Sequence, residues 1–440
     1  MKLPCYILCF VIFSSTYFFV ICQNVPGPRR QHASTLIGTR AYFFGGEMAT
    51  SRSNEVWYLD LSSSFNVLTP PWHSDGIMPV GYNLGSSCLS PFDNSTLFLV
   101  GGRTWIITAT TYTYSYTSSV YKFDSKISQW STPIISNFNS SFASRDKIQS
   151  VIDIHGRIFI FGGANENNSI YYNDMNILDI TTMTWSTQIQ SIPTYLDYTA
   201  TLLPNGLIIY IGGHSGSNSI VNLNSMSQVQ VFDTKSYTWS NQLVGGSIIA
   251  SRAFHSAVLT QDGNIIIYGG STTLGTSLSI DNVFSDIAVL NTDTWVWSVP
   301  SISGPIAPPL ARHSATLYKN YMILAFGSTS KSILYTNNIY ILDIQNYTWV
   351  NSFNINIPTT TNSPTVQSNS NSQTSQEDHN SSNLYIGIGI CVAVVILAVI
   401  LFIVGFFIYK NRHKEIIKIP GTSMMDDDTL ENHISTVYTS

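Results

Sequence analysis

The feature of this sequence that most constrains its fold is a unit that occurs six times along the chain. Each unit contains an apolar run that ends in a pair of glycines, and the pairs follow one another at intervals of about 50 to 60 residues, which is typical of repeat arrays and propellers. The sixth run keeps only Gly327, so we expect its second glycine to be missing. The six runs lie at residues 41–46, 97–102, 157–163, 207–213, 265–270 and 322–328.

A second apolar run follows each glycine pair and ends in an acid or its amide. In units two to six a tryptophan stands six residues later, whereas in unit one Trp72 is displaced. The acid or amide suits a turn, because its side chain accepts hydrogen bonds from nearby backbone amides. We expect the tryptophan to enter the next strand and to fill the wedge between neighbouring sheets. The second runs end at Asp60, Asp124, Asp179, Asp233, Asn291 and Asp343.

The runs are short, rich in β-branched and aromatic residues, and bounded by Gly, Asn, Asp and Ser, which is the chemistry of strands and turns. A further strand precedes the glycines, as in residues 255–260 and 313–318. No stretch of residues 23–355 shows a sustained helical period. Four antiparallel strands per unit and six units predict an all-β propeller of six blades, with glycines where adjacent backbones approach closely.

The set of residues that repeats here resembles the kelch repeat. The set consists of the glycine pair, a strand that ends in aromatic-x-x-Asp, and the tryptophan six residues later, and it covers about residues 29 to 352. The kelch family folds as a β-propeller, so the resemblance implies a kelch-type propeller. Unit one has its tryptophan late, unit five has Asn291 in place of Asp, and unit six has a single glycine.

Both ends of the chain carry uncharged apolar runs. Lys2 precedes the first, and we expect residues 1–22 to be a signal peptide. The second, residues 384–409, is long enough to form a transmembrane helix, since about 20 apolar residues span a bilayer core. Basic residues stay cytoplasmic, and they follow this run within the tail, residues 410–440. The pattern therefore predicts a type I single-pass protein, with the plasma membrane as its default location. The basic residues are Lys410, Arg412, Lys414 and Lys418.

Between the two runs, the sequence predicts an ectodomain and a stalk. Residues 23–355 hold the propeller, and residues 356–383 are rich in Thr, Ser, Asn, Gln and Pro and cannot pack. Cys88 is the only thiol of the ectodomain, so no disulfide forms within it. Sequons for N-glycosylation predict surface positions if the chain enters the secretory pathway. They stand at Asn94, Asn139, Asn167, Asn346 and Asn380.

The charge and the polar residues narrow the classes of function. Residues 23–383 contain 15 basic and 20 acidic side chains, so their net charge is negative. A negatively charged surface does not attract phosphate backbones, so nucleic acid is not an expected partner. His32, His255 and His313 stand near equivalent unit starts, which favours a shared structural role over metal binding. Arginines recur there too, and they either line a pocket for an acidic ligand or bond backbone carbonyls. These arginines are Arg29, Arg145, Arg252 and Arg312.

The kelch resemblance also implies one class of enzyme. Galactose oxidase-like copper enzymes have kelch-type propellers, and their site contains a Tyr-His pair, further Tyr and His ligands, and a cysteine cross-linked to a tyrosine. This sequence has no Tyr-His dipeptide, and Cys88 lies close to a strand that precedes residues 97–102, where a small buried residue is expected. We therefore expect no cofactor and no catalysis. A membrane-tethered carbohydrate oxidase or hydrolase remains the alternative.

The loop at residues 103–119 is the longest and most aromatic one to follow a glycine pair, and it is our candidate ligand surface. Its aromatic side chains suit contacts with a sugar or a peptide. Alternatively, the tyrosines at every second position extend a β-hairpin with one face packed. With no catalytic constellation in the sequence, we expect a non-enzymatic recognition or adhesion module for an extracellular protein or glycan. The candidate residues are Arg103, Trp105, Tyr112, Tyr114 and Tyr116.

Overall fold

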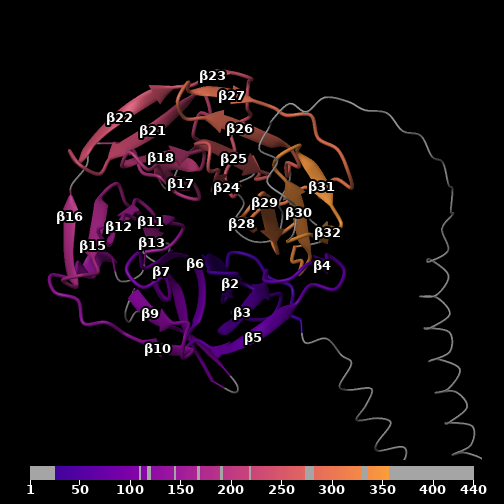
Figure 1. Ribbon diagram of the computed structural model, residues 1–440. Helices are drawn as coiled ribbons and strands as arrows, with labels where there is room; N and C mark the ends of the chain where they lie inside the picture. The colour runs from indigo at the N-terminus through magenta and orange to yellow at the C-terminus, as the bar shows by residue number, and fades with distance from the viewer. Residues whose placement is uncertain are drawn as a thin grey trace, which may run out of the picture. The chain divides into compact units, whose positions relative to one another are not determined.

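Six antiparallel sheets surround a common centre in the computed structural model of this chain (Figure 1). The structure describes residues 25–355 except 109–110, 116–119, 143–144, 166–168, 189–191, 218–219, 273–281 and 330–333. In each sheet, four strands follow one another outwards from the centre in chain order, as the blades of a propeller do. The prediction of an all-β propeller with six blades of four antiparallel strands is confirmed.

Blade 1 contains β1 (Ala33–Ile37), β2 (Arg40–Phe44), β3 (Glu55–Asp60) and β5 (Trp72–Ile77). Blade 2 contains β6 (Gly81–Leu89), β7 (Thr96–Ile107), β9 (Val120–Asp124) and β10 (Gln129–Ser131), with β8 (Tyr112–Ser115) paired to β7. Blade 3 contains β11 (Ser150–Ile152), β12 (Arg157–Phe161), β15 (Met175–Asp179) and β16 (Thr184–Gln188). Blade 4 contains β17 (Thr199–Leu202), β18 (Leu207–Ile211), β21 (Gln228–Asp233) and β22 (Thr238–Leu243).

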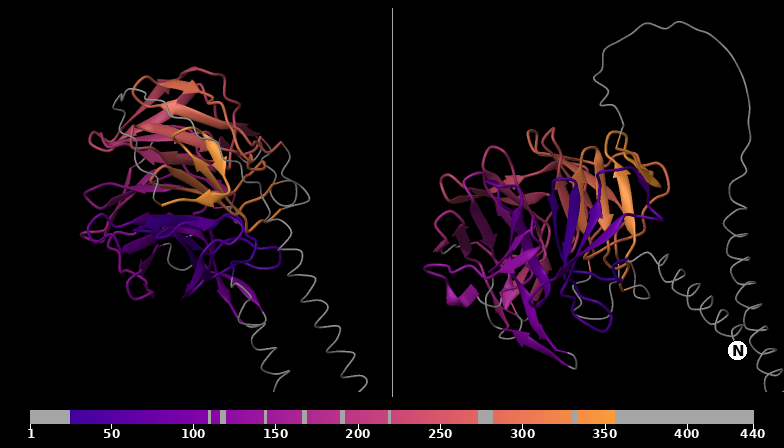
Figure 2. Two further views of the ribbon diagram at one scale, coloured as in Figure 1. Left: turned by 45° about the vertical axis from the view of Figure 1, so that its right-hand side comes forward. Right: turned by 60° about the horizontal axis from the view of Figure 1, so that its bottom comes forward.

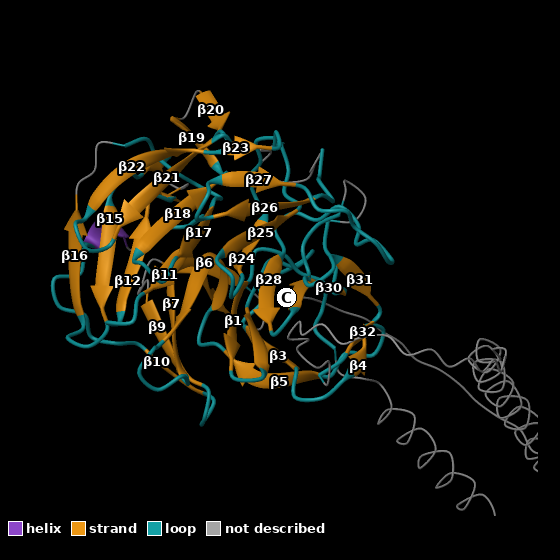
Figure 3. Ribbon diagram, turned by 45° about the horizontal axis from the view of Figure 1, so that its top comes forward, coloured by secondary structure: helices purple, strands orange, loops and turns teal. Residues whose placement is uncertain are grey.

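Blade 5 contains β24 (Ser256–Leu259), β25 (Asn264–Tyr268), β26 (Ile287–Asn291) and β27 (Val296–Ser298), with β23 (Gly245–Gly246) parallel to β27. Blade 6 contains β28 (Ser314–Tyr318), β29 (Tyr321–Ala325), β30 (Ile339–Asp343) and β31 (Thr348–Val350). Short pairs of strands lie outside the blades. β13 (Ala164–Asn165) pairs with β14 (Ile170–Tyr171). β19 (His214–Ser217) pairs with β20 (Ile220–Leu223), and β4 (Phe65–Asn66) pairs with β32 (Ser352–Phe353) (Figure 3). A 3-10 turn, η1, spans Ser140–Phe142.

The hydrophobic core is divided into six clusters, and each cluster lies between two neighbouring blades. Every cluster includes or contacts one tryptophan from the outermost strand of its later blade, which confirms the predicted wedge role. The displaced Trp72 takes the same position between blades 6 and 1. Burial of such large rings supplies much of the apolar area that holds two sheets together. The tryptophans are Trp72, Trp130, Trp185, Trp239, Trp297 and Trp349.

The glycine pairs lie where each second strand meets the next blade. Gly269 shows why no side chain fits: its φ is 68°, and a Cβ there would stand 2.2 Å from the carbonyl oxygen of Leu310. The second glycine of each pair donates its backbone N–H to a carbonyl of the following blade, as Gly270 does to Leu310 at 2.8 Å. Close approach of adjacent backbones therefore explains the recurrence of the pair.

Blade 6 corrects one expectation. Gly327 has φ 98° and donates to the carbonyl of Arg29, so it occupies the second position of the pair and the first glycine is the missing one. Phe326 stands in the first position with a left-handed φ of 61°. Its ring packs in the cluster between blades 6 and 1, 5.5 Å from the ring of Trp72. The aromatic contact offsets part of the cost of that backbone conformation.

The ring closes without a strand exchanged between the first and last blades. Blade 1 (indigo) and blade 6 (orange) lie side by side, and no described residue of 25–28 joins a sheet (Figure 2). Near the centre, Arg29 donates its backbone N–H to Thr336 at 3.2 Å. At the rim, Phe353 pairs with Phe65 through β32 and β4, and the two rings stack at 5.2 Å.

Four predicted segments lie outside the described residues: the signal peptide at 1–22, the stalk at 356–383, the transmembrane helix at 384–409 and the tail at 410–440. Within the described part of the chain, none of the helices has the length and apolar character to cross a membrane.

Candidate functional site

The propeller has two faces that differ in what they present. We call the side where each innermost strand begins and each glycine pair ends the mouth face. The opposite side holds the turns between the first and second strands and between the third and fourth, and we call it the turn face. Strand-ending acids such as Asp179 lie on the turn face, where their carboxylates accept backbone N–H groups of the turn, at 2.8 Å from Thr181. This confirms the predicted role of these acids in turns.

Six residues, one from each blade, form a ring at the mouth face, and we call them the collar. Each collar residue stands shortly before or within an innermost strand, and each donates its backbone N–H to the carbonyl of the preceding collar residue over 2.9 to 3.2 Å. The bond from Gln31 to Arg312 closes the ring. All six have left-handed φ angles between 53° and 63°. The collar consists of Gln31, Leu84, Lys147, Asp197, Phe254 and Arg312.

The six collar residues share one backbone conformation, but their side chains differ. A left-handed backbone costs about 1 to 2 kcal/mol for a residue other than glycine, and Gly or Asn relieves that cost. None of the six positions holds Gly or Asn, and their side chains are an amide, an aliphatic chain, an amine, a carboxylate, an aromatic ring and a guanidinium. Strained positions of this kind gather at functional sites. Left-handed residues also recur in the turns after the third strands, as at Met183 and Tyr237, but the collar residues are joined to one another in a closed ring of backbone bonds. The collar is therefore our candidate for a site built on this fold.

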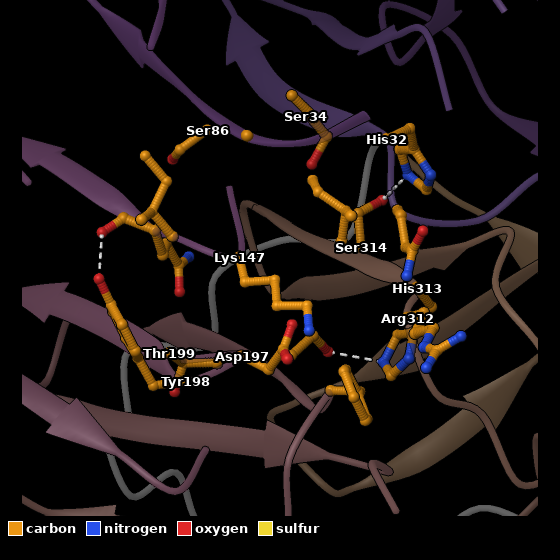
Figure 4. Close-up of a pocket in the computed structure, with 18 of the residues that line it drawn as sticks. His32, Ser34, Ser86, Lys147, Asp197, Tyr198, Thr199, Arg312, His313 and Ser314 are labelled. Atoms are coloured by element: carbon orange, nitrogen blue, oxygen red, sulfur yellow. Dashed lines mark hydrogen bonds between the residues drawn. The ribbon is translucent and has the colours of Figure 1, made fainter. Parts of the chain in front are cut away.

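A cavity of about 230 Å³ opens at the collar (Figure 4). It is lined by the collar residues and by the first residues of the innermost strands, so that all six blades contribute. The strand residues are small, and they include hydroxyl side chains, such as those of Ser86, Ser256 and Ser314, as well as alanines. The cavity is thus the upper end of the central channel, with hydroxyl groups below a ring of longer side chains.

The three unit-start histidines join neighbouring blades beneath the collar. Nε2 of His32 lies 2.8 Å from Oγ of Ser314, that of His313 lies 2.8 Å from Oγ of Ser256, and that of His255 lies 3.0 Å from Oγ1 of Thr199. Burial lowers the pKa of all three imidazoles to about 3, so they are neutral near pH 7. Their equivalent inter-blade bonds agree with the predicted structural role.

Two of the three charged collar residues, Lys147 and Asp197, stand in the neighbouring blades 3 and 4. Asp197 accepts a hydrogen bond from Nε2 of His214 at 3.1 Å, and Figure 4 shows Lys147 reaching towards the same carboxylate. Burial alone raises the pKa of Asp197, but the His214 bond and the nearby Lys147 and Arg312 cations outweigh it and hold the pKa below its usual value. Asp197 is therefore ionised at neutral pH.

A second group of charges borders the collar at blades 1 and 6. Glu47 accepts from Nε of Arg30 at 3.0 Å and lies 3.1 Å from Nη2 of Arg52, so two guanidinium groups share one carboxylate. Arg30 also lies over the Tyr335 ring at 4.8 Å, and Arg52 over Trp105 at 5.4 Å. This arrangement leaves a local excess of positive charge on the mouth face.

The recurring arginines divide between the two alternatives left open by the sequence. Arg29, Arg145 and Arg252 each donate to the carbonyl of the first glycine of their own blade and form an ion pair with an acid at or beside the third strand. In Arg252, the two terminal guanidinium nitrogens donate to the carboxylate of Asp286, at 2.6 and 2.9 Å. These three have structural roles. Arg312 differs, because it belongs to the collar and lines the cavity.

The predicted ligand surface forms a hairpin, since β7 continues past its glycines and pairs with β8. The rings of Trp105 and Tyr114 meet edge to face at 5.6 Å, and Nε of Arg103 donates to Asp146 at 2.5 Å. The backbone of Tyr112 pairs with Ile107, and Tyr116 lies outside the described residues. The hairpin alternative is thus confirmed for the backbone, while binding of a ligand there stays a prediction.

Other predicted positions fall away from the collar. Asn94 and Asn346 are exposed in turns on the turn face, Asn139 is half-buried before blade 3, and Asn167 and Asn380 lie outside the described residues. Their glycosylation stays a prediction. Cys88 is buried beside Ser150, and burial raises its thiol pKa to about 12, as expected for a small core residue. Within the described ranges, no three His, Cys, Asp or Glu side chains gather as metal ligands do.

Sequence reasoning missed most of the collar, because only Arg312 stood out among recurring residues. Gln31, Leu84, Lys147, Asp197 and Phe254 share a conformation and not a residue type. One signal was present: in blades 5 and 6 the collar residue precedes the unit-start histidine directly, as it also does in blade 1. Aligning the remaining units on the first strand would have located the ring.

Glycine pairs at blade contacts, tryptophan wedges and four-stranded sheets in sixfold array together define a propeller of the kelch class. The chain matches the KLHDC2/KLHL20/DRC7 Kelch-repeats domain model in two overlapping segments, residues 90–273 and 197–389. These segments cover more than half of the chain, which therefore belongs to this Kelch-repeat family. Propellers of this family bind proteins, so the family points to a protein-binding module.

Several relatives share this part of the chain. Kelch domain-containing protein 3 of Rattus norvegicus is 26% identical over 324 residues, which are 70% of this chain and 79% of that protein. Acyl-CoA-binding domain-containing protein 5 of Arabidopsis thaliana is 26% identical over 330 residues, or 72% and 46% of the two chains. The Rab9 effector protein with kelch motifs of Mus musculus is 27% identical over 162 residues, or 36% and 39%. The last is named as an effector of Rab9.

Proposed function

We propose that this chain is a type I single-pass membrane protein whose propeller lies outside the cell and binds a partner protein through its mouth face, without catalysing a reaction. The observation that carries the proposal is the collar. Six different side chains are held around one cavity by a closed ring of backbone hydrogen bonds, at a cost in backbone strain that glycine would avoid. A purely structural ring has no need of those side chains.

The extracellular part of the proposal is supported by sequence alone. The uncharged runs at 3–22 and 384–409, with basic residues after the second, are the pattern of a signal peptide and a stop-transfer segment. The plasma membrane is the default for such a chain. Its topology is testable by adding protease to intact cells that produce the full-length chain with a tag on the tail. Cleavage of the propeller with retention of the tag supports the orientation, and full protection of the propeller contradicts it.

Partner binding is testable with the purified full-length chain on arrays of cell-surface proteins and of polysaccharides. We expect a protein to bind and its binding to weaken when Lys147 and Arg312 are both replaced by alanine. The matched control replaces Lys126 and Lys235, two lysines in turns of the turn face, and should leave binding unchanged. Binding to a polysaccharide alone would move the partner class to glycans. An absence of binding on both arrays would count against recognition.

The alternative, a membrane-tethered carbohydrate oxidase or hydrolase, makes a different prediction for the same material. An oxidase would contain stoichiometric copper by metal analysis and would release peroxide from sugars, and a hydrolase would release reducing ends. Turnover of either kind that survives purification would replace the recognition proposal. We expect neither copper nor peroxide, because the sequence offers no Tyr-His pair and because Cys88 is buried with a hydroxyl partner, Ser150.

A further inference from the structure

The turn between β6 and β7, on the turn face of blade 2, carries an exposed aromatic ring. Phe92 is 58% exposed, and contact with blade 3 holds one edge of its ring. A Cβ placed on Gly156, in the first turn of blade 3, would stand 2.6 Å from Cε2 and 2.8 Å from Cζ of that ring. The rest of the ring faces solvent. A group that covers this surface would remove apolar area from water, which is favourable.

Hydrogen bonds hold the Phe92 turn in one conformation. The carboxylate of Asp93 accepts the backbone N–H groups of Ser95 and Thr96 at 3.0 and 2.9 Å, and it accepts the Thr96 hydroxyl at 2.6 Å. The carbonyl of Ser95 accepts both the backbone N–H and the hydroxyl of Ser125, at 3.1 and 2.9 Å. The turn is therefore ordered in advance, so a group that packs on it does not have to immobilise the loop.

Asn94 stands in the same turn, two residues after Phe92. It is exposed, and its φ of 49° is left-handed, a conformation that asparagine adopts more readily than most residues. With Thr96 two residues further on, Asn94 is the acceptor of an N-glycosylation sequon. Two residues span at most about 7 Å, so the first sugar attached to Asn94 is within reach of the ring. An attachment point and an exposed ring thus share one ordered turn.

The other two sequon asparagines within the described residues lack this combination. Two residues before Asn346 stands Ile344, which is half-buried and packs against the core between blades 5 and 6. Asn139 is half-buried, and its own amide donates to the hydroxyl of Thr187 at 3.3 Å. Of these three asparagines, Asn94 alone follows an exposed aromatic ring at that spacing. A glycan at Asn94 should therefore affect the fold differently from one at Asn346.

We propose that Asn94 carries an N-linked glycan whose first N-acetylglucosamine packs on the ring of Phe92 and stabilises the contact between blades 2 and 3. The inference rests on the extracellular location in the proposed function and adds to it a modification site with a structural role. The C–H groups on one face of the sugar are attracted to the negative face of the aromatic ring. The sugar also covers apolar surface that the protein leaves in water.

The attachment itself needs a sugar donor of one chemical class, a lipid-pyrophosphate-linked oligosaccharide. Nδ2 of Asn94 forms a bond to C1 of the first N-acetylglucosamine, and the bond from C1 to the pyrophosphate oxygen breaks. The lipid pyrophosphate leaves with the electron pair of that bond, and one proton is lost from Nδ2. No electrons are gained or lost overall, so the step requires no oxidant or reductant.

Thermal unfolding of the full-length chain from eukaryotic cells tests the proposal, with peptide mass spectrometry to detect the glycan at each site. We expect Asn94 to be glycosylated and Asn94→Gln to lower the Tm by about 1 to 4 °C. In a Phe92→Ala background, Asn94→Gln should change the Tm by less than about 1 °C, because the sugar has no ring to cover. The matched control, Asn346→Gln, removes a turn-face sequon that lacks such a ring and should leave the Tm unchanged.

A second measurement does not depend on replacing Phe92. An endoglycosidase that cleaves after the first N-acetylglucosamine trims every glycan to one sugar. Trimmed wild-type and trimmed Asn94→Gln chains should still differ by the full shift in Tm, because the first sugar makes the contact. Loss of the difference on trimming would assign the stabilisation to the outer sugars and would overturn the packing on Phe92.

The outcomes separate this inference from the proposed function. An unmodified Asn94 on chains whose Asn346 carries a glycan would overturn the inference and leave the extracellular location standing. Equal shifts in Tm with and without the Phe92 ring would overturn the contact alone. If no sequon is modified, protease added to intact cells decides between the two cases. Cleavage of the propeller would then mean that only the inference is wrong, and protection would mean that the location is wrong as well.

Discussion

The inter-blade positions and the collar positions each occur in all six blades. The inter-blade positions share a residue type, whereas the collar positions share a backbone conformation. Between the blades the residue type returns, because a wedge such as the one that Trp297 fills has the same shape each time. At the collar only the backbone conformation recurs, so that Leu84 and Lys147 share one conformation but have unlike side chains. Packing against a neighbour constrains chemistry, whereas a ring of backbone bonds does not. Specialisation is therefore possible at the collar without loss of the fold.

The largest effect should come from removing a wedge. Trp297 is 2% exposed and donates its indole N–H to the carbonyl of Met226 at 2.7 Å. We expect Trp297→Ala to lower the free energy of unfolding by about 3 to 5 kcal/mol, because it opens a cavity between blades 4 and 5. Urea unfolding followed by tryptophan fluorescence measures the change. The control Ile248→Ala removes a fully exposed side chain and should have almost no effect.

A slightly smaller loss is expected at a glycine contact. Gly269→Ala places a Cβ 2.2 Å from the carbonyl oxygen of Leu310, so the blades must separate in addition to the strain of φ 68°. Gly38 has a similar φ of 59° with open space around it. Gly38→Ala should therefore cost only the backbone strain, about 1 to 2 kcal/mol, and Gly269→Ala clearly more. Equal losses for the two variants would contradict the close-approach explanation.

The inter-blade histidines predict a pH effect. The folded chain holds His32, His255 and His313 with pKa values of about 3, while the unfolded chain has them near 6.5. As the pH falls, the histidines of the unfolded state bind protons before those of the folded state. Their contribution to the free energy of unfolding is therefore fully present above about pH 6.5 and is lost as the pH decreases towards 3. Each histidine contributes about 1.4 kcal/mol per pH unit in that window. His255→Asn should make the decline shallower by about one proton; an unchanged slope would refute the assignment.

Sequence reasoning reached the fold because the contacts that build it repeat. Each tryptophan and glycine pair recurs at a position where two blades meet, so six imperfect copies reinforce one pattern. The pattern did not resolve which glycine blade 6 lacks, because Phe326 adopts a left-handed backbone that residue type alone does not reveal. Trp72 is displaced in the sequence, but a longer loop before it still places its ring between blades 6 and 1, like the other wedge tryptophans.

The candidate site was less accessible to the same reasoning. Arg103 and Trp105 attracted attention because aromatic and basic residues cluster in one loop, and the structure pairs that loop into a hairpin. Asp197 and Lys147 gave no such signal, since each is a single residue whose equivalents in other blades differ. The signal for a site formed by unlike residues at equivalent positions is their place in the unit, so the units must be aligned with one another before such a site can be found.

The smallest effect on stability should come from a substitution in the collar. Leu84→Gly should stabilise the folded state by about 1 to 2 kcal/mol, because glycine adopts the φ of 59° without strain. The greater conformational freedom of glycine in the unfolded chain offsets about 0.5 to 1 kcal/mol of this. Leu84 is only partly buried, so little packing is lost. We expect the free energy of unfolding to change by less than about 1 kcal/mol, measured as for Trp297→Ala. A large loss would mean that the collar side chains hold the ring together, and the distinction between framework and site would fail.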